Sequence, residues 1–463
     1  MLRLILLLAT LTVSACGTGP AANNKTERRA DATMIDLPPM KHFGSNRIAG
    51  PNRSNHDIAN DFLDLSFQME SGRILPIMTR FEGPISLRVT GHAPSSLHPD
   101  LTALLKRIKN EAGIKITRVA PGQDANITIE AISRAKLQKL VPHAACFVVP
   151  NVSSWADYRR LRRSSAINWS DLKIRKKVAI FLPNDVSPQE VRDCLHEELA
   201  QALGPLNDLY RLSDSVFNDD NFHTVLTGFD MLILRAYYAP QMHNGMSRAQ
   251  AAAVLPKLLA RLNPRGQRLS RAQITSPTPR SWINAIETAL GAKASAAKRR
   301  SAANKAVSIA QANGWNDTRL GFSLYALGRL SLSSKSDDAL AAFLSSGLVF
   351  KSGRETQIQS AHVAMQLSAF ALAAGDGETA LMLANKHLPA VAAAENASLL
   401  ATLLLIKAEA LELTGRASEA HQVRQDGLGW ARYGFGSDKI VRRRLAEIKA
   451  LTPKRPIHKT ANL

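Results

Sequence analysis

Residues able to carry out chemistry gather in one short segment, 197–208. It contains two adjacent carboxylates, Glu197 and Glu198, and a third one further along, Asp208. Clustered carboxylates raise one another's pKa, and a carboxyl group that titrates near neutral pH can act as a general acid or base. Carboxylate oxygens are also the ligands that hard divalent cations prefer. The segment therefore indicates either the acid–base chemistry of a hydrolase or the binding of a hard cation.

A helix is expected to position the first two of these carboxylates. Ser187-Pro188-Gln189-Glu190 is a capping box with proline at the first helical position, so a helix should begin there. It should run through Leu203 and end at Gly204, because glycine commonly follows a helix C-terminus. Residues 55–263 as a whole mix short β-rich runs with amphipathic helical segments, which predicts an α+β domain. The expected strands are 85–89, 127–129, 146–149 and 178–182, and the expected helices include 58–67 and 101–108.

From Glu197 to Asp208 the chain reads EELAQALGPLND, and this stretch resembles the metzincin zinc-peptidase signature HExxHxxGxxHD without a gap. In that signature two histidines four residues apart share a helical face, a third follows the glycine, and the glutamate is the general base. The resemblance implies a metzincin-like (zincin-type) fold for residues 55–263, with Ser215-Val216-Phe217 at the position of the family's Met-turn. All three ligand positions differ from the signature, because Glu197, Gln201 and Asn207 stand where the histidines would be.

These three changes argue against zinc catalysis. One carboxylate and two amide oxygens suit a hard ion far better than zinc. Without a metal nothing lowers the pKa of water, so Glu198, at the position of the general base, has no activated nucleophile to serve. We therefore expect a pseudo-metallopeptidase with no cofactor, in which Glu198 is the one candidate catalytic residue. The alternative is a hydrolase that uses Glu197, Glu198 and Asp208 with a non-zinc metal or with no metal.

Other polar residues near this segment are weaker candidates. His196 points about 100° away from Glu197 on a helix, so it should be exposed or satisfied by a hydrogen bond rather than act as a ligand. His223 and His243 follow the segment, but nothing in the sequence places them in a cleft. The Asp/Asn-rich stretch 207–221 could bind calcium, although caps and turns are the commoner use of these residues.

Residues 54–67, 70–73, 80–84 and 194–220 together resemble an uncharacterised bacterial domain of unknown function, found in secreted and lipid-anchored proteins.

The first residues indicate export. Residues 1–15 read as a signal peptide, and Leu11-Thr12-Val13-Ser14-Ala15-Cys16 resembles a bacterial lipobox. The resemblance implies that Cys16 is lipidated and anchors the protein to the envelope membrane, facing the periplasm. An ordinary signal peptide followed by a chance cysteine is the alternative. Residues 16–54 are expected to be a flexible tether, and Gly17 after the cysteine favours the outer membrane.

With Cys16 lipidated, Cys146 and Cys194 are the two cysteines that remain. In an oxidising compartment we expect them to form a disulfide, which loop entropy would make worth about 4 kcal/mol. Two buried free thiols are the alternative.

The chain is long and basic. Its 463 residues predict two or three domains, and its formal net charge is +21. Basic residues gather in residues 159–163, 173–177, 298–305 and 442–444 and in the tail 451–463. No nucleic-acid motif and no interleaved aromatic residues accompany these runs, so we expect solvated surfaces and no nucleic-acid partner.

Beyond a linker at residues 264–280, residues 281–450 are expected to be almost entirely helical. Small residues recur there in pairs, Gly291/Ala296, Ser334/Ala339, Gly375/Ala380 and Gly415/Ala420, so that the alanines are 43, 41 and 40 residues apart. The pattern resembles tetratricopeptide-like helical repeats, although their usual period is about 34 residues and their Trp/Tyr signature is absent. Stacked helix pairs would form a groove for a protein partner. A non-repetitive helical bundle is the alternative.

Overall fold

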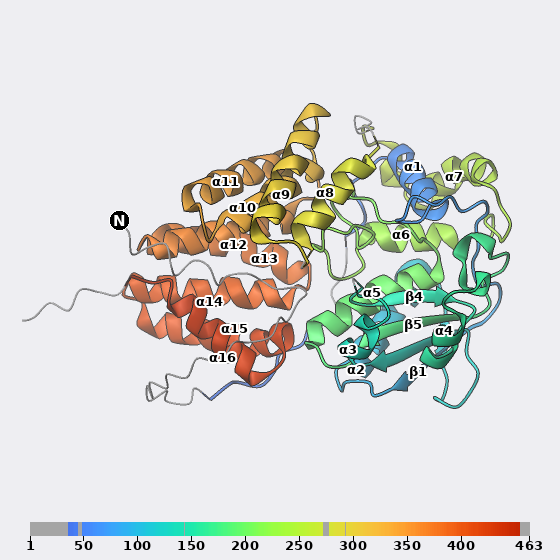
Figure 1. Cartoon of the computed structure of the whole chain (residues 1–463), viewed down its shortest axis with the longest axis horizontal. Coiled ribbons are helices and arrows are strands. Elements are labelled where there is room, and N and C mark those ends of the chain that lie inside the picture. The colour runs from blue at the N-terminus through green and yellow to red at the C-terminus, as the bar shows by residue number, and fades with distance from the viewer. Residues whose placement is uncertain (1–35, 45–48, 143, 272–276, 292, 454–463) are drawn as a thin grey trace, which may run out of the picture. The chain divides into compact units, whose positions relative to one another are not determined.

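The computed structural model describes residues 36–44, 49–142, 144–271, 277–291 and 293–453 (Figure 1). They form two compact units. The first holds the described residues from 43 to 278 together with 353–356, and the second holds the described residues up to 42 together with 279–352 and 357–453. The first unit is a mixed α/β structure and the second is all-helical. The predicted signal peptide, Cys16 and most of the basic tail lie outside the described residues.

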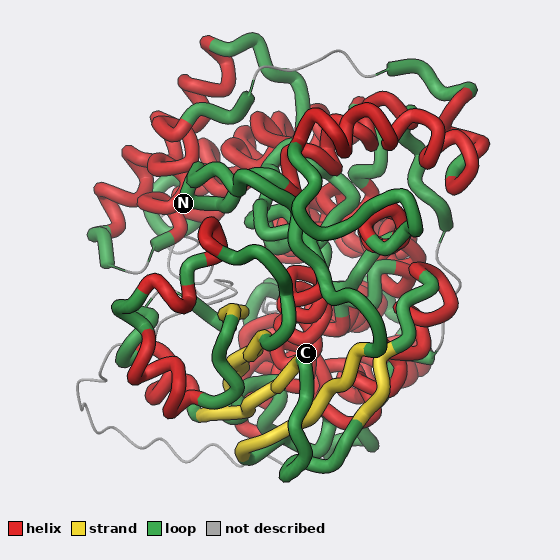
Figure 2. Tube along the Cα trace, turned by 90° about the vertical axis from the view of Figure 1, so that its right-hand side faces the viewer, coloured by secondary structure: helices red, strands yellow, loops and turns green. Residues whose placement is uncertain are grey.

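A five-stranded sheet organises the first unit. Its strands are β1 (Ile85–Gly91), β2 (Ile116–Arg118), β3 (Ile127–Ile132), β4 (Phe147–Pro150) and β5 (Val178–Pro183). They lie in the order β2-β1-β3-β5-β4, and Figure 2 shows them side by side. β4 pairs with β5 in the antiparallel sense, whereas the other neighbours are parallel. The four predicted strands correspond to β1, β3, β4 and β5, and the short edge strand β2 was not predicted.

Helices cover both faces of this sheet. Val178, Ile180 and Leu182 of β5 belong to the main core, and Ala179 and Phe181 belong to a smaller core on the other face. This alternation follows from the period of two along an extended strand. The main core includes α1 (Asn55–Ser66), α2 (Leu97–Arg107), α5 (Pro188–Leu203), α6 (Gly228–Tyr237) and α7 (Arg248–Leu262). The smaller core includes α3 (Arg134–Gln138) and α4 (Trp155–Leu161). Short turns of other helix types occupy Ile108–Ala112, Ser165–Ile167, Trp169–Asp171 and Pro264–Gln267.

The second unit consists of consecutive helices that pack against one another. They are α8 (Arg280–Leu290), α9 (Ala296–Ala312), α10 (Thr318–Ser331), α11 (Ser336–Ser352), α12 (Gln357–Ala373), α13 (Gly377–Ala393), α14 (Ala397–Leu413), α15 (Ala417–Phe435) and α16 (Asp438–Lys449). Ala339, Ala380 and Ala420 are fully buried, each at the fourth position of α11, α13 or α15. Ala296 instead is the exposed first residue of α9, so it does not share this register.

Residues 38–42, within the segment expected to be a tether, belong to the second unit and contact its helix α15. The Lys41 amide donates a hydrogen bond to the Gly429 carbonyl over 3.1 Å, and Arg432 donates to the Pro38 carbonyl over 2.9 Å. Both contacts attach the segment to α15.

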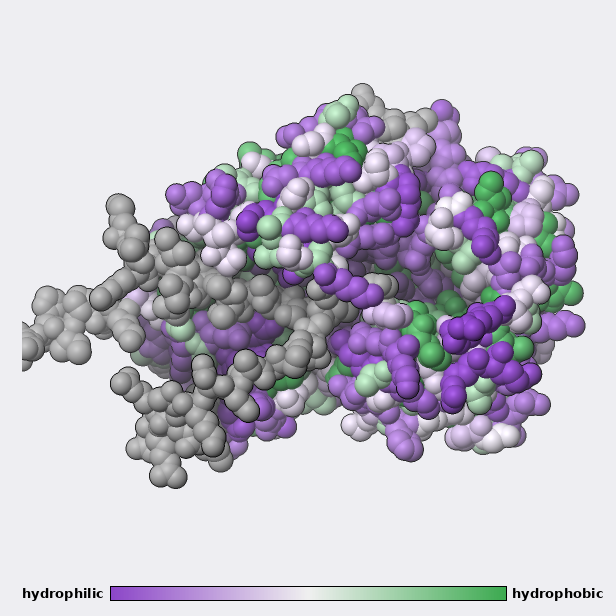
Figure 3. Space-filling model, in the orientation of Figure 1, coloured by the Kyte–Doolittle hydropathy of each residue, from purple (hydrophilic) through white to green (hydrophobic). Residues whose placement is uncertain are grey.

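In the described ranges, no helix combines the length and the apolar character needed to cross a bilayer. Hydrophilic residues predominate on the face seen in Figure 3, where hydrophobic residues form only small separate patches.

Candidate functional site

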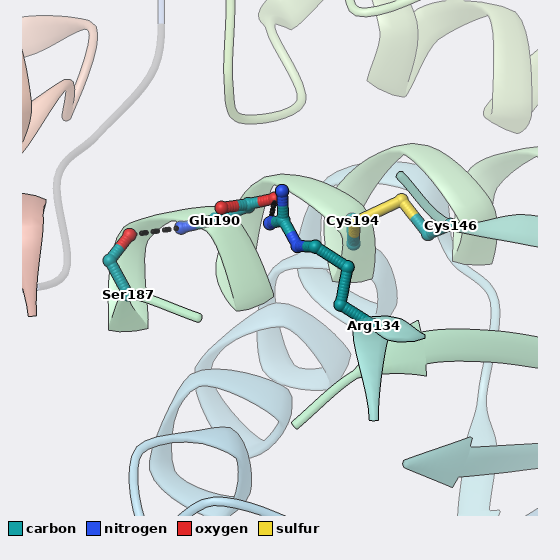
Figure 4. The surroundings of a disulfide bond; sticks show 5 residues. All are labelled: Arg134, Cys146, Ser187, Glu190 and Cys194. Carbon is teal, nitrogen blue, oxygen red and sulfur yellow. Dashed lines mark hydrogen bonds and ion pairs between the residues drawn. A yellow bond between two sulfur atoms is a disulfide. The ribbon is translucent and has the colours of Figure 1, made fainter. Parts of the chain in front are cut away.

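Helix α5 begins and ends at the predicted residues. The Ser187 hydroxyl accepts a hydrogen bond from the Glu190 amide over 3.2 Å, Pro188 is the first helical residue, and Gly204 is the C-cap. The Glu190 carboxylate pairs with Arg134, so only half of the expected capping box is present (Figure 4). Ser187, Pro188 and Gly204 therefore set the two ends of the helix.

The predicted disulfide between Cys146 and Cys194 is confirmed (Figure 4). Cys194 lies in the middle of α5, Cys146 directly precedes β4, and their Cα atoms are 5.9 Å apart. The bond attaches the antiparallel edge strand to the helix that carries Glu197 and Glu198.

A buried arginine holds the C-terminal end of α5. The Arg175 side chain donates to the carbonyl oxygens of residues 201, 202 and 204 over 2.7, 2.7 and 3.0 Å. Its guanidinium also lies 4.8 Å from the centre of the Trp169 ring. A cation is favourable here, because the last carbonyls of a helix lack intrahelical donors and carry partial negative charge. Arg175 is only 2% exposed, so the prediction that residues 173–177 are a solvated surface is wrong at this position.

After Gly204 the chain turns back to α1 and places Asp208 beside it. The Leu206 amide donates to the Leu65 carbonyl over 3.1 Å, and the Asn207 side chain donates to the Asp64 carbonyl over 2.9 Å. These two bonds fix the backbone immediately before Asp208. The Leu209 amide then donates to the carbonyl of Phe217 over 2.9 Å. Phe217, at the position predicted for the Met-turn, is fully buried.

Asp208 belongs to a group of three carboxylates drawn from separate segments. Each of Glu70, Asp208 and Asp219 has a carboxylate oxygen that lies within 4.8 Å of a carboxylate oxygen of the other two. Glu70 lies on a tight turn after α1, in which the Met69 amide donates to the Arg73 carbonyl over 2.9 Å. The Tyr210 hydroxyl donates to Asp219 over 3.3 Å. The turn and Asp219 are at the surface, whereas Asp208 is largely covered.

Glu197 and Glu198 extend this acidic group along α5. Burial, followed by the charges of Asp219 and Glu70, raises the pKa of Glu197 to about 8. Burial and the charges of Glu197 and Glu70 raise the pKa of Glu198 well above its usual value, and burial with the charges of Glu70 and Asp219 does the same for the pKa of Asp208. Glu198 Oε2 and both carboxylate oxygens of Asp208 are buried, and no N–H group of the described residues donates to them. The carboxyl groups of Asp208 and Glu70 lie close enough to share a proton, which also raises the pKa of Asp208. The structure thus brings the three predicted carboxylates together with Asp219 of the Asp/Asn-rich stretch and with Glu70, which was not predicted.

The positions that would bind zinc in a metzincin do not suit zinc here. Glu197, Gln201 and Asn207 offer oxygen ligands, whereas structural and catalytic zinc sites are built mainly from histidine and cysteine. Gln201 is 7% exposed, and the Asn207 amide group already donates to the Asp64 carbonyl. Within the described residues, the carboxylates close enough to share an ion do not include Glu197, and no histidine joins them. We therefore derive no zinc-dependent step.

The histidines near the segment serve other purposes. His196 is 1% exposed, and its Nδ1 accepts a hydrogen bond from the Leu226 amide over 3.1 Å, so the prediction that it is satisfied is confirmed. Burial holds the pKa of His196 well below its ordinary value. The Nε2 atom of His223 lies 3.0 Å from the Ser213 carbonyl, and burial lowers the pKa of this histidine too. His243 is exposed.

Stretch 207–221 is used partly for turns and partly for other contacts, since Asn207 donates to the Asp64 carbonyl and Asp214 pairs with Arg53. Asn218 Oδ1 accepts from the Asp220 amide over 3.1 Å, and Asp220 Oδ1 accepts from the Phe222 amide over 3.0 Å. These are Asx turns, the use that the composition favours. Asp208 and Asp219 instead contribute to the carboxylate group.

Sequence reasoning missed Glu70 as a site residue. Its stretch, Glu70-Ser71-Gly72-Arg73, was noted only for its family resemblance. The available signal was an acidic residue close to a glycine soon after a helix, because glycine is common in tight turns. In the structure Gly72 has a φ of +81°, a conformation that glycine adopts readily. A surface pocket of about 380 Å³, lined by residues that include Asn151, Asn168 and Lys173, lies elsewhere, because none of the five carboxylates of this site lines it.

Comparison with known proteins identifies the first unit without explaining it. No curated protein sequence and no solved structure matches the chain. A family model described as "Protein of unknown function (DUF2927)" matches residues 55–257, which run from the first residue of α1 into α7. A DUF2927 domain of unknown function therefore spans residues 55–257, which contain the disulfide and the carboxylate group.

Proposed function

We propose that this protein is a lipid-anchored protein of the bacterial cell envelope whose DUF2927 domain is a metzincin-like fold that has lost zinc catalysis and acts by binding. One observation carries the proposal. Helix α5 and the turn at Gly204 match the framework of the zinc-peptidase signature, yet Glu197, Gln201 and Asn207 occupy its ligand positions. The Asn207 amide group, at the third position, serves the backbone of α1 instead.

The metal content of the full chain tests this proposal. We expect no stoichiometric zinc after purification in the presence of zinc, measured by mass spectrometry of the metals. The variant E197H/Q201H/N207H is the matched control, because it restores three imidazoles to the same helix and turn. It should gain affinity for zinc if the framework has the proposed geometry. One equivalent of zinc in the wild type, lost in Gln201→Ala, would refute the loss of zinc binding.

The lipid anchor is supported by the lipobox-like residues that end at Cys16. Cys16→Ser should abolish incorporation of labelled palmitate and move the protein from the membrane fraction to the soluble periplasmic fraction. Density separation of the two membranes of the wild-type cells then tests the expectation, drawn from Gly17, that the outer membrane holds the anchor. A Cys16→Ser protein that stays in the membrane fraction would contradict lipid anchoring.

The tetratricopeptide-like helices of the second unit are proposed to bind a protein partner. Support comes from apolar side chains that are exposed on two of them, Leu344 (51%) and Leu348 (68%) on α11 and Met382 (60%) on α13. Leu344 and Leu348 are four residues apart and share one face of α11. Crosslinking in cells should capture a partner with the wild type but not with L344D/L348D. Capture that does not require residues 281–450 would refute this role.

A hydrolase is the second candidate function, and the raised pKa values favour it. With the pKa of Glu197 at about 8, this carboxyl group is largely protonated at neutral pH, as a general acid must be. The pKa values of Glu198 and Asp208 are raised as well, so these groups would act as bases or ligands only when ionised, a form that a bound non-zinc metal would favour. Any hydrolysis of peptide or glycan by the full chain should be lost in Glu198→Gln. Activity that this substitution leaves unchanged would exclude the mechanism.

A further inference from the structure

Three carboxylates converge at one place in the DUF2927 domain from the turn after α1, the segment after α5 and the Asp/Asn-rich loop. The carboxylate oxygens of Glu70, Asp208 and Asp219 lie within 4.8 Å of one another. Calcium binds oxygen ligands at about 2.3–2.6 Å, so ligands on opposite sides of the ion are about 5 Å apart. The three oxygens therefore fit within one calcium coordination sphere with little movement of their side chains.

A second observation concerns two buried carboxyl groups at this place, Glu198 and Asp208, to which no donor among the described residues gives a full complement of hydrogen bonds. Glu198 is 4% exposed, and its Oε2 atom has no hydrogen-bond partner. Its carboxyl group is near enough to Glu70 and Glu197 for their charges to act on it. Both oxygens of Asp208 are likewise buried, and among the described residues no N–H group donates to them, while the Glu70 carboxyl group is close enough to share a proton with Asp208. In the described parts of the chain, no basic side chain forms an ion pair with Glu197, Glu198 or Asp208.

Buried carboxylates without hydrogen bonds or basic partners are costly, because they lose their hydration without replacement. Protonation reduces that cost, and so does a cation that accepts the same oxygens as ligands. The exposed Glu70 and Asp219 give an ion a route from solvent to the covered Asp208. The ligand type excludes a preference for zinc, and magnesium releases its water reluctantly in favour of protein ligands.

We propose that Glu70, Asp208 and Asp219 form a calcium site of the DUF2927 domain, with Glu198 beside it. The site is separate from the positions of the zinc-peptidase ligands and does not depend on the function proposed above. The partly open setting and the three carboxylates place it with the weaker sites of extracellular modules, which bind calcium with dissociation constants of about 10⁻⁴–10⁻³ M. A bound ion would join α1, the end of α5 and the following loop.

Isothermal titration calorimetry of the full chain, stripped with EDTA and titrated with CaCl2, MgCl2 or ZnCl2, tests the site. We expect one calcium per chain and at least about tenfold weaker binding in Asp208→Asn and in Glu70→Gln, because each removes one charged ligand. Glu190→Gln is the matched control, since this α5 carboxylate pairs with Arg134 and not with the group. Its calcium affinity should equal that of the wild type.

Thermal unfolding supplies a readout that a purely structural role would not produce. In EDTA, Asp208→Asn should unfold at the same temperature as the wild type or higher, because it removes a buried charge. Calcium should raise the unfolding temperature of the wild type but not that of the variant. If Asp208→Asn does not fold, Glu70→Gln decides the question, since Glu70 is exposed. No binding at about 10 mM calcium, equal affinity in all variants, or tighter binding of zinc would each overturn the proposal.

Discussion

Replacing Arg175 with methionine should destabilise the DUF2927 domain by about 3 kcal/mol and loosen the turn that carries Asn207 and Asp208. Arg175 is almost completely buried, and no carboxylate of the described residues pairs with it. Its partners are the carbonyls of residues 201, 202 and 204 and, more weakly over 3.4 Å, the Thr79 hydroxyl. The substitution therefore removes the donors of the last turn of α5.

The expected loss of stability in Arg175→Met is the balance of two opposing contributions. Each buried carbonyl that loses its donor costs about 1–3 kcal/mol, so three of them set an upper range of about 3–9 kcal/mol. Methionine recovers part of this, because it keeps apolar contact with Trp169 and removes the cost of burying a charge. That cost is real, because burial lowers the pKa of Arg175. A net loss near the lower end, about 3 kcal/mol, is the expected result.

Urea unfolding of the full chain, read by hydrogen exchange of the amides in α5, measures this loss in the relevant domain. Arg159→Met is the matched control, because Arg159 is an exposed arginine of the neighbouring basic run and should change stability little. Arg175→Lys keeps the charge without the planar group of donors, so it should fall between methionine and the wild type. A methionine variant within about 0.5 kcal/mol of the wild type would refute the role assigned to Arg175.

Three further predictions concern the same helix. Because the pKa of Glu197 is raised to about 8, its carboxyl group in the folded state holds a proton that the unfolded state has lost. Without divalent cations, Glu197 should therefore contribute a fall of about 1.4 kcal/mol per pH unit to the free energy of unfolding between about pH 4.5 and 8, in addition to the falls from Glu198 and Asp208. Urea unfolding at several pH values should show a shallower fall for Glu197→Gln, and an identical slope would contradict the assignment. The C146S/C194S protein should lose up to about 4 kcal/mol in the same assay, and no change would show that the loop is already ordered when unfolded. Gly204→Ala should cost about 1–3 kcal/mol, because its Cβ would lie 3.0 Å from the Tyr237 ring; a neutral result would mean that the ring moves aside.

Features set by neighbouring residues could be predicted from the sequence. The boundaries of α5 depend on Ser187, Pro188 and Gly204, whose effects on helix ends are local. The strands of the parallel sheet were visible because buried strands form short apolar runs. The β2 edge strand lacks such a run, since its three residues are partly or fully exposed.

Features that depend on contacts between distant segments could not be predicted. Glu70 and Asp219 reach Asp208 only through the bonds that return the chain to α1, and no spacing in the sequence encodes that approach. Arg175 was misread because its neighbours Lys176 and Lys177 are exposed, and composition does not reveal which member of a basic run turns inward.

The carboxylate group is hard to explain as a packing device. A buried position that only fills space is better served by an apolar side chain or by an amide of the same shape, because neither brings an uncompensated charge. Yet Glu198 and Asp208 are acidic, and the charges of Glu70 and Glu197 raise the cost of ionising both. The surrounding hydrogen bonds also fix the backbone on either side of Asp208. In the zinc peptidases that the sequence resembles, neutral histidines hold the charge of a metal. In the metzincin-like fold proposed for this domain, the ligand positions are polar or acidic, and further carboxylates lie beside them. An acidic group of this kind gains stability only by holding protons or a cation, so its chemistry has to be sought in what it binds.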